Sequence, residues 1–490
     1  MGVRNSQQLR SRGAREVAVT VVDDLRVVLP ADAVISDRDV LGSYRRDRAG
    51  LTEAGDPACV VLPRDAEEVA TVVRIAAESG TPVVPRGAGS GLSGAANAID
   101  GCIIVSLMRM DRIVEIDPDN LLAVVEPGVL NSALAAAVAA HGLWYPPDPA
   151  SREFSTIGGN LATNAGGLCC VKYGVTGDFV LGLEVVLADA RVARFGRRTV
   201  KGVAGYDVVA LFVGSEGTLG IITQATLRLR PRRPPPATLV ATFGALASCG
   251  DAIARIMRRT VPALLEVLDR TTIQAIDEWK RMGFGPDTGA LLVAQSDVAG
   301  AEAGEELETI ERCCRGAGAV FVARSSDRDE ADELMAARRF AYEALERQGA
   351  TLLDDVAVPP ARVPDLLAGI EQISAARGVV IGTFGHAGDG NMHPTIVFDR
   401  DDVSGVAAAR AAFDDIVELA LRLGGTVTGE HGVGVLKRAH LARELGQTGV
   451  DVHGWVKDAF DPGSILNPGK VTVERRGPRP PVRLHQGGDA

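Results

Sequence analysis

Short runs of Val, Ile and Leu alternate with longer Ala-rich stretches from Val60 onward, and this alternation limits the fold more than any other feature of the 490-residue sequence. Apolar runs of this length are typical of buried strands, and the Ala-rich stretches have the periodicity of amphipathic helices. The segment 230–236 interrupts the pattern with four Pro and three Arg in seven residues, so we place a domain boundary there. The sequence therefore predicts two domains that each combine helices with strands.

The expected elements differ in spacing on the two sides of this boundary. On the N-terminal side, we expect helices at 65–79 and 131–141, a long Gly- and Asn-rich loop at 155–167, and strands at 59–62, 82–85, 101–106, 112–117, 122–126, 182–187 and 221–229. On the C-terminal side, we expect strands at 238–243, 291–295 and 320–323 and helices at 245–259, 302–316, 329–347 and 406–423. The spacing favours an α+β layer in this second half.

The composition limits the partners and the location of the protein. Lys and Arg number 52 against 63 Asp and Glu, giving a net charge of −11, and aromatic residues are few, so we expect no nucleic-acid partner. The seven Cys are an odd number without a C-x-x-C motif, which favours a reducing compartment. The longest apolar stretch, 129–145, carries polar residues, and the first sixteen residues lack an apolar core. We therefore expect no membrane span, no secretory leader and a cytoplasmic protein.

A Gly-rich loop follows the strand expected at 82–85. The segment 86–94, Arg-Gly-Ala-Gly-Ser-Gly-Leu-Ser-Gly, leaves backbone N–H groups uncovered, and such groups can approach a diphosphate. Gly89, Gly91 and Gly94 also fit the G-x-G-x-x-G pattern of nicotinamide-binding domains, although the segment 95–101 is too short for the helix that this fold requires. A cofactor phosphate site, a nicotinamide site and a tight turn without a ligand are all compatible with these residues.

Further motifs follow in order along the chain, at 147–149, 155–167, 201–207, 214–223, 385–393, 429–432 and 466–470. Together with the loop at 86–94, they closely resemble the FAD-binding domain of the vanillyl-alcohol oxidase and p-cresol methylhydroxylase superfamily. The three C-terminal motifs, including Gly-His-Ala-Gly-Asp-Gly-Asn-Met-His at 385–393, are similar to those of one branch. That branch contains the FAD subunit of glycolate oxidase, D-lactate dehydrogenase and D-2-hydroxyglutarate dehydrogenase. The resemblance extends from Tyr44 to Val471, nearly the whole chain.

The resemblance implies a mixed α/β (α+β) protein with a two-subdomain FAD-binding domain of the p-cresol methylhydroxylase type and a ferredoxin-like C-terminal cap. We expect an N-terminal extension and helix at 1–54, the FAD-binding domain at 55–233, the cap with a C-terminal return to the flavin at 234–471, and a disordered basic, Pro-rich tail at 472–490. The residues expected to contact FAD are Arg86, Gly87, Ala88, Gly89, Ser90, Gly91, Pro149, Ile157, Gly158, Asn160, Thr163, Asn164, Gly166, Glu216, Gly220, Ile222 and Asn467. FAD would be held without a covalent bond, although Cys169 and Cys170 lie close to the second loop.

Three of the seven His, at 386, 393 and 431, lie in Gly-rich segments of the second domain. Strands expected at 379–385 and 392–398 flank Asp389-Gly390, the favoured dipeptide of a type I′ hairpin turn. This turn would pair 388 with 391, 387 with 392, and His386 with His393. Directly opposite Cβ atoms lie about 5 Å apart, so both imidazoles can reach one metal ion.

Glu430, directly before His431, can complete a set of two His and one carboxylate that leaves coordination positions for a substrate. The alternative is that these His are hydrogen-bonded loop residues. The resemblance implies a divalent metal on His386, His393 and Glu430, with Zn²⁺ favoured over Mn²⁺ and Fe²⁺.

The resemblance also implies an activity: oxidation of a D-2-hydroxy acid, of the glycolate, D-lactate or D-2-hydroxyglutarate type, to the 2-oxo acid by hydride transfer to the flavin. His431 would accept the hydroxyl proton, and Arg338 would bind the substrate carboxylate, with the adjacent Arg339 as the other candidate. Asn391 and Asn467 would orient the metal site and the flavin.

The expected partners are a small 2-hydroxy acid and an unidentified electron acceptor or redox partner protein, and a homodimer is compatible with the sequence. Two alternatives stay open. One is an FAD oxidase of the same fold that acts on another alcohol, and the other is a non-catalytic flavoprotein subunit of a redox complex.

Overall fold

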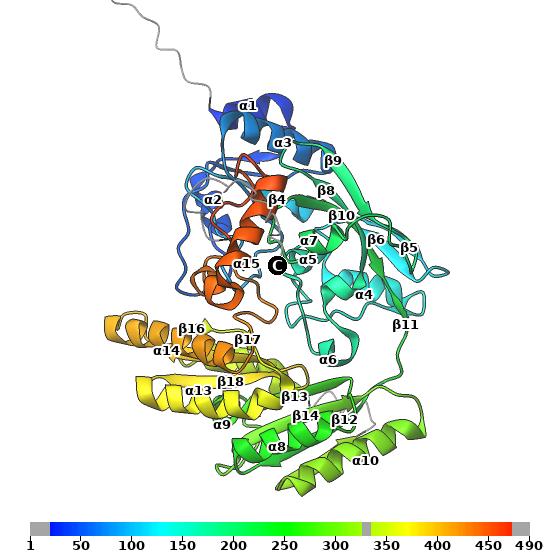
Figure 1. Cartoon of the computed structure of the whole chain (residues 1–490), viewed down its shortest axis with the longest axis vertical. Helices are drawn as coiled ribbons and strands as arrows, with labels where there is room; N and C mark the ends of the chain where they lie inside the picture. The colour runs from blue at the N-terminus through cyan, green and yellow to red at the C-terminus, as the bar shows by residue number, and fades with distance from the viewer. Residues whose placement is uncertain (1–19, 326–334, 473–490) are drawn as a thin grey trace, which may run out of the picture.

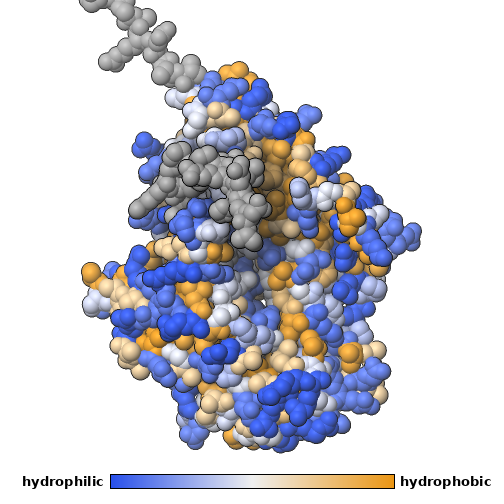
Figure 2. All heavy atoms as spheres, in the orientation of Figure 1, coloured by the Kyte–Doolittle hydropathy of each residue, from blue (hydrophilic) through white to orange (hydrophobic). Residues whose placement is uncertain are grey.

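Residues 20–325 and 335–472 are described in the computed structural model, and they form two bodies joined near residue 231 (Figure 1). The first 19 residues, nearly all of the predicted tail and the start of the helix expected at 329–347 lie outside the described residues. The fold mixes helices and strands, as predicted. None of the described helices is long and apolar enough to cross a membrane. On the face shown in Figure 2, polar and apolar side chains are interspersed.

The first subdomain contains a four-stranded sheet in the order β1-β2-β4-β3. The strands β2 (Cys59–Val61), β4 (Ile103–Ser106) and β3 (Val83–Arg86) are parallel, and β1 (Val34–Ile35) is an antiparallel edge strand. Three helices accompany them: α1 (Val21–Val28), α2 (Arg38–Tyr44) and α3 (Ala66–Ser79). The described stretch 87–102 between β3 and β4 holds no helix, so the strand–helix–strand unit of a nicotinamide site is absent there.

The second subdomain contains a five-stranded antiparallel sheet in the order β5-β6-β10-β8-β9. Its strands are β5 (Ile113–Asp117), β6 (Leu122–Val125), β8 (Val180–Val186), β9 (Val192–Gly196) and β10 (Ile221–Arg228). The short strands β7 (Leu143–Trp144) and β11 (Arg230–Pro231) pair at the boundary with the cap. The helices are α4 (Asn131–Ala139), α5 (Ile157–Thr163), α6 (Cys170–Tyr173) and α7 (Val209–Phe212).

The cap is built on an eight-stranded sheet in the order β15-β12-β14-β13-β18-β19-β16, with β17 also paired to β19. One hydrophobic core joins one face of the sheet to α8 (Leu246–Met257), α10 (Ala301–Gly316), α13 (Val363–Arg377) and α14 (Val403–Arg422). A second core joins the other face to α9 (Arg270–Lys280) and α12 (Ala336–Glu346). The strands are β12 (Ala237–Phe243), β13 (Leu264–Asp269), β14 (Ala290–Ser296), β15 (Phe321–Ser325), β16 (Ala350–Leu353), β17 (Val356–Ala357), β18 (Val380–His386) and β19 (Asn391–Phe398).

After α14 the chain returns to the first body, where α15 (Arg438–Phe460) lies among the N-terminal elements (Figure 1). Phe460 packs against the core of the second subdomain, and Ile465 belongs to the core of the first. Leu466 forms a parallel bridge to Val83 of β3. The last described residues therefore join the two subdomains of the first body.

Most expected elements are present, with ends shifted by a few residues. The prediction of an uninterrupted loop at 155–167 is wrong because α5 lies inside it, with Thr156 accepting a hydrogen bond from the Gly159 N–H at its start. The helices α9, α13 and α15 were not expected. In α15 the pattern is obscured by Gly446, which has a left-handed φ of 66° and kinks the helix.

Candidate active site

A cavity of 710 Å³ lies between the first body and the cap. The Gly-rich loop after β3 and the start of α5 line it from the first body. Side chains of β13, β18, β19 and α12 line it from the cap. The two Gly-rich loops recognised in the sequence therefore face the histidine motifs across one cavity.

Thirteen of the residues predicted to contact FAD line this cavity: Arg86, Gly87, Ala88, Gly89, Ser90, Gly91, Pro149, Gly158, Asn160, Thr163, Glu216, Gly220 and Ile222. The other four do not line it and have structural contacts instead. Ile157 is part of the hydrophobic core, and Asn164 ends α5 and accepts a hydrogen bond from the Gly177 N–H. Asn467 donates to the backbone oxygens of Ala95 and Glu216.

Gly166, the fourth of these residues, marks a close approach between the two bodies. A Cβ at this position would lie 2.4 Å from Glu430 Oε2, so any larger residue would displace the Glu430 side chain. Gly166 therefore lets the second Gly-rich loop reach the histidine site without itself lining the cavity.

Glu216 ties the first body to the segment that carries His431. Its buried carboxylate accepts hydrogen bonds from the N–H groups of Val433, at 2.6 Å, and Gly434, at 2.9 Å. Burial raises the pKa of Glu216 to about 7, although these two hydrogen bonds oppose the shift. The segment after Glu430 is thus held against the cavity wall by a residue of the FAD-binding domain.

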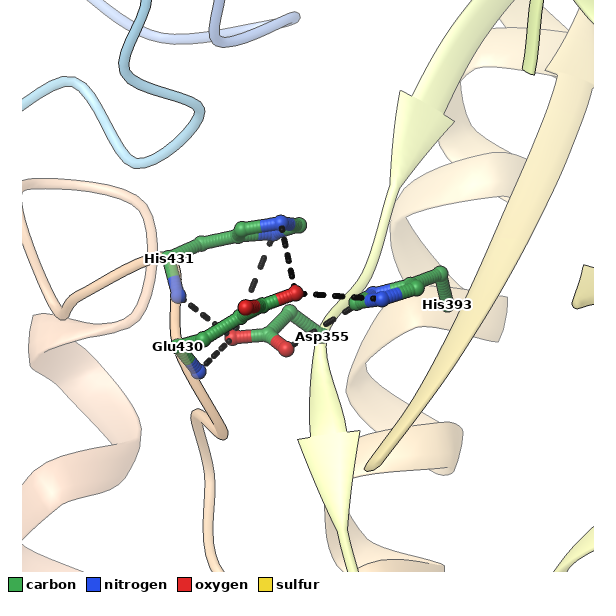
Figure 3. A group of neighbouring side chains, drawn as sticks. All are labelled: Asp355, His393, Glu430 and His431. Carbon is green, nitrogen blue, oxygen red and sulfur yellow. Dashed lines mark hydrogen bonds and ion pairs between the residues drawn. The ribbon is translucent and has the colours of Figure 1, made fainter. Parts of the chain in front are cut away.

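The predicted metal ligands converge on one oxygen atom of Glu430. Glu430 Oε1 lies 3.3 Å from Nε2 of His386 and 3.3 Å from Nε2 of His393. His431 stacks on His393 with ring centroids 5.1 Å apart and an angle of 17° between the ring planes, and its Nε2 is 3.9 Å from the same oxygen. Figure 3 shows His393, Glu430 and His431 around this point with Asp355 below them.

Two buried carboxylates, Glu266 and Asp355, hold these side chains in position from the side away from Glu430 Oε1 or through the backbone. Glu266 on β13 accepts a hydrogen bond from His386 Nδ1 at 2.6 Å. Asp355 Oδ2 accepts the N–H groups of Gly429, Glu430 and His431, each at 2.9 Å, and its Oδ1 lies 3.7 Å from His393 Nδ1 (Figure 3). Asp355 therefore fixes the backbone on which Glu430 and His431 stand.

The charges in this group favour a cation beside Glu430. Burial by itself would lower the pKa of His386, but Glu266 and Glu430 raise it well above its ordinary value. Burial would raise the pKa of Glu430, but hydrogen bonds from His386 and His393 hold it well below its ordinary value. Burial lowers the pKa of His393 to about 4, so this ring stays neutral at pH 7 and can offer a lone pair.

The predicted hairpin is present, but its predicted register is wrong. His386 pairs with Asn391, and Phe384 pairs with His393. Only Gly390 has positive φ, whereas a type I′ turn needs positive φ at Asp389 as well, so the loop spans the four residues 387–390. The register differs by two residues, which keeps His386 and His393 on one face with ring centroids 5.2 Å apart.

Arg338, rather than Arg339, lies beside the histidines. Arg338 on α12 is buried, its Nε donates to Glu266, and its Cζ is 4.9 Å from the Phe384 ring. Arg339 lines the cavity but is exposed. Asn391 does not line the cavity: it packs behind Gly429, where a Cβ would lie 2.3 Å from Asn391 Oδ1.

Cys169 lines the cavity close to two charged groups. Its Sγ lies 3.3 Å from Arg233 Nη1 and 3.5 Å from Asp148 Oδ2. Burial raises the pKa of both Cys169 and Cys170 far above the ordinary thiol value, so both thiols are protonated at pH 7 and are poor nucleophiles. All seven cysteines lie in the described part of the chain and are free thiols.

Glu266 and Asp355 were not predicted from the sequence. Each had a weak signal, because Glu266 stands between apolar residues of β13, and Asp355 follows the apolar strand β16. A charge inside an apolar strand requires a buried partner, but the pattern does not say which one.

Two family models match the chain: an FAD binding domain over residues 57–196 and the C-terminal domain of FAD linked oxidases over residues 234–471. The glycolate oxidase subunit GlcD of Bacillus subtilis is 41% identical over 417 residues, which cover 85% of this chain and 89% of that protein. The chain belongs to the FAD-linked oxidase family. The predicted resemblance is confirmed, and this FAD-linked oxidase is an oxidoreductase with an FAD-binding domain.

More distant comparisons agree with this assignment. A D-lactate dehydrogenase of Anaerostipes hadrus is 33% identical to this FAD-linked oxidase over 469 residues, which cover 93% of this chain and 98% of that protein. The crystal structure of p-cresol methylhydroxylase with substrate bound has a TM-score of 0.78 and covers 93% of this chain and 96% of that chain. At 19% identity, the second comparison shows the fold alone, which is of the predicted type.

Proposed function

We propose that this FAD-linked oxidase oxidises a D-2-hydroxy acid to the 2-oxo acid, with FAD held by the Gly-rich loops and a divalent metal held by His386, His393 and Glu430. Relatives named glycolate oxidase and D-lactate dehydrogenase support the reaction class, because glycolate and lactate are 2-hydroxy acids. The observation that carries the proposal is that the Gly-rich loops and the histidine group line the same cavity.

The side chains fit a metal ion on three counts. Glu430 Oε1 lies 3.3 Å from the Nε2 atoms of both His386 and His393. His386 has a carboxylate at its other ring nitrogen, an arrangement common among metal-bound histidines. Two nitrogens and one oxygen form a set that suits Zn²⁺, which we propose ahead of Mn²⁺ and Fe²⁺.

A second group of ligand atoms, from Asp355, His393, Glu430 and His431, lies within 4.8 Å of one another and leaves out His386. We assign Asp355 a supporting role because its Oδ2 already accepts three backbone N–H groups. His431 is the most exposed of the three histidines, with 19% of its side chain accessible, which suits a group that exchanges protons.

The residues of the chain divide the chemistry between them. Bound FAD would supply the hydride acceptor, and a bound divalent ion would supply the Lewis acidity that makes an alcohol easier to deprotonate. Arg338 binds the substrate carboxylate and so fixes the position of C2 and its hydrogen. His431 accepts the hydroxyl proton through Nε2, while the stacking against His393 holds its ring in place. Turnover then requires an acceptor, either a small molecule or a redox partner protein, to reoxidise the flavin.

The proposal is tested by mixing the holoenzyme anaerobically with D- and L-2-hydroxy acids and following flavin absorbance. We expect a D-2-hydroxy acid to bleach the flavin. Chelator treatment or His386→Ala should abolish bleaching and leave FAD bound, because His386 lies on the cap and the Gly-rich loops on the other body. His431→Asn should retain the metal and slow reduction by about 10²–10⁴-fold, the usual effect of losing a general base.

The control for these variants is His141→Ala, since His141 is exposed and does not line the cavity. Normal reduction after verified metal removal would eliminate the metal from the proposal. Near-normal reduction in a metal-loaded His431→Asn protein would show that the proton leaves by another route.

A further inference from the structure

Apolar side chains form the cavity wall beside the histidines. Five of them line the cavity and share one apolar cluster, in which the cap residues Leu264, Met335 and Phe384 are buried and Leu168 and Leu353 are partly buried. They come from four places in the cap and from the loop before α6 in the first body. The fold thus gathers an apolar surface from segments far apart in the sequence.

Phe384 lies between the two groups that the proposed function assigns to the substrate. Its ring is 4.9 Å from Arg338 Cζ, and its centroid is 5.7 Å from the ring centroid of His393. Consider a 2-hydroxy acid whose carboxylate binds Arg338 and whose hydroxyl binds at the histidine group. Its C2 atom then lies next to the Phe384 ring. The side chain on C2 then lies near the apolar wall.

The polar side chains near this wall already have partners. Arg233 lies 3.6 Å from the buried Asp297 and over the Trp144 ring at 4.5 Å, and it also donates to Cys169. Gln295 donates its amide to Thr238 at 3.1 Å. A second carboxylate on the substrate would lose its water against this wall, where the described residues hold no cation reserved for it, and this loss is unfavourable.

We infer that the preferred substrates are 2-hydroxy monocarboxylic acids with an aliphatic side chain, which packs against Leu264, Leu353 and Phe384. The inference rests on the proposed function and adds the substrate class to it. Glycolate has no side chain and leaves the apolar wall uncovered. Each methylene buried against the wall should raise kcat/KM roughly 4-fold, from the usual transfer free energy of a methylene group.

The test compares anaerobic flavin reduction of the holoenzyme by glycolate, D-lactate, D-2-hydroxybutyrate, D-2-hydroxy-4-methylpentanoate and D-2-hydroxyglutarate. We expect kcat/KM to rise through the first four acids and to be at least about 10-fold lower for D-2-hydroxyglutarate than for the best aliphatic acid. A best rate with glycolate or D-2-hydroxyglutarate would overturn the inference and leave the proposed function intact. Failure of every acid to reduce the flavin would overturn both.

Variants at Leu353 locate the preference on the wall. Leu353 is only partly buried, so Leu353→Lys adds a cation at the wall at little cost to folding. It should shift the ratio of kcat/KM values at least about 10-fold from the aliphatic acid toward D-2-hydroxyglutarate. Leu353→Ala should reduce the gain per methylene without favouring the dicarboxylate.

The matched control is Val380→Lys, because Val380 is half exposed on β18 and does not line the cavity. The control should leave the substrate ratios unchanged. Unchanged ratios in flavin-loaded Leu353→Lys and Leu353→Ala proteins would overturn the assignment of the wall.

Discussion

At the scale of single residues, the buried Glu266 connects two groups with different proposed tasks. One of its oxygens accepts from His386 Nδ1 and the other from Arg338 Nε. With a metal bound, the contact with Nδ1 would keep the ring proton on that nitrogen and leave Nε2 free to be a ligand. The contact with Arg338 orients the guanidinium at the cavity wall. One carboxylate thus positions both a proposed metal ligand and the proposed binding group for the substrate carboxylate.

Glu266→Gln keeps the size of the side chain and removes its charge. We expect affinity for added Zn²⁺ to fall about 10–100-fold, because the carboxylate that orients His386 is lost. We also expect a higher KM for the 2-hydroxy acid, because Arg338 loses its fixed partner, and unchanged FAD content. Metal titration calorimetry and steady-state kinetics measure the two effects.

The control for Glu266 is Glu306→Gln, which changes a half-buried carboxylate of the cap that accepts hydrogen bonds from Thr260 and Ser296 away from the cavity. Glu306→Gln should leave the affinity for Zn²⁺ and the KM for the 2-hydroxy acid unchanged. Equal Zn²⁺ affinity in wild type and Glu266→Gln would exclude Glu266 from orienting His386.

Cys169 and Cys170 are the nearest candidates for a covalent bond to flavin, and their raised pKa values argue against one. We expect acid precipitation of the yellow protein to release all of the flavin into the supernatant, measured by its absorbance. Cys169→Ser should behave like the wild type. Flavin that stays with the precipitated wild-type protein, but not with Cys169→Ser, would identify a covalent bond to that residue.

The sequence revealed the residues that stand in Gly-rich motifs and hid those that support them. The three histidines were recognisable because Gly-rich segments lack an apolar face on which a histidine would pack as a core residue. Glu430 was recognisable because it directly precedes His431. Glu266 is 120 residues away from His386 in the sequence, and only the pairing of β13 with β18 brings them together. Such a contact depends on strand order, which local patterns do not specify.

At the scale of elements, α5 shows how tertiary contacts override weak helix propensity. Its sequence, Ile-Gly-Gly-Asn-Leu-Ala-Thr, contains two glycines and favours a loop. Both ends of the helix are capped, by the Thr156 side chain at the N-terminus and by Asn164 in the left-handed conformation at the C-terminus. The same glycines expose backbone to the cavity.

Gly159→Val is expected to give a folded protein with little FAD. A Cβ at Gly159 meets only Thr156 Oγ1, at 3.3 Å, so the fold tolerates it, while the added methyl groups block the backbone at the cavity wall. Flavin content per protein and circular dichroism measure the two outcomes. Gly89 is unsuitable for this test, because its φ is 72° and a Cβ there would lie 2.1 Å from Arg86 Nη2.

Gly304→Val provides the control for Gly159. Gly304 is exposed on α10, and a Cβ there meets nothing within 4 Å. The Gly304→Val protein should keep its full flavin content. Full flavin occupancy in Gly159→Val as well would remove the start of α5 from the cofactor site.

At the scale of the whole molecule, Asp297 at the end of β14 fixes the cap against the first body. Its buried carboxylate forms an ion pair with Lys172, accepts a hydrogen bond from Tyr173 at 2.5 Å, and lies 3.6 Å from Arg233. Lys172 and Tyr173 belong to α6, and Arg233 lies in the segment that joins the bodies. The cavity between the bodies therefore depends on this contact.

Asp297→Asn is expected to reduce the free energy of unfolding by roughly 1–3 kcal/mol. Removing one partner of a fully buried pair typically costs about 3–5 kcal/mol, but here solvent reaches the side chains of Lys172 and Arg233, which are 25% and 24% exposed. Urea unfolding followed by circular dichroism at pH 7 measures the loss. Asp251→Asn, which breaks a pair on the surface of α8, should change the value by less than about 0.5 kcal/mol.

The effect of Asp297→Asn should also depend on pH. Burial would raise the pKa of Asp297, but the bonds from Lys172 and Tyr173 hold it below its ordinary value of 3.8. A carboxyl group with a lowered pKa stabilises the folded state above its unfolded pKa, and the stabilisation disappears as pH falls through the folded value. The difference between wild type and variant should therefore be constant from pH 6 to pH 8 and shrink below about pH 4. A difference that grows on acidification would mean that the charge on Asp297 does not hold the two bodies together.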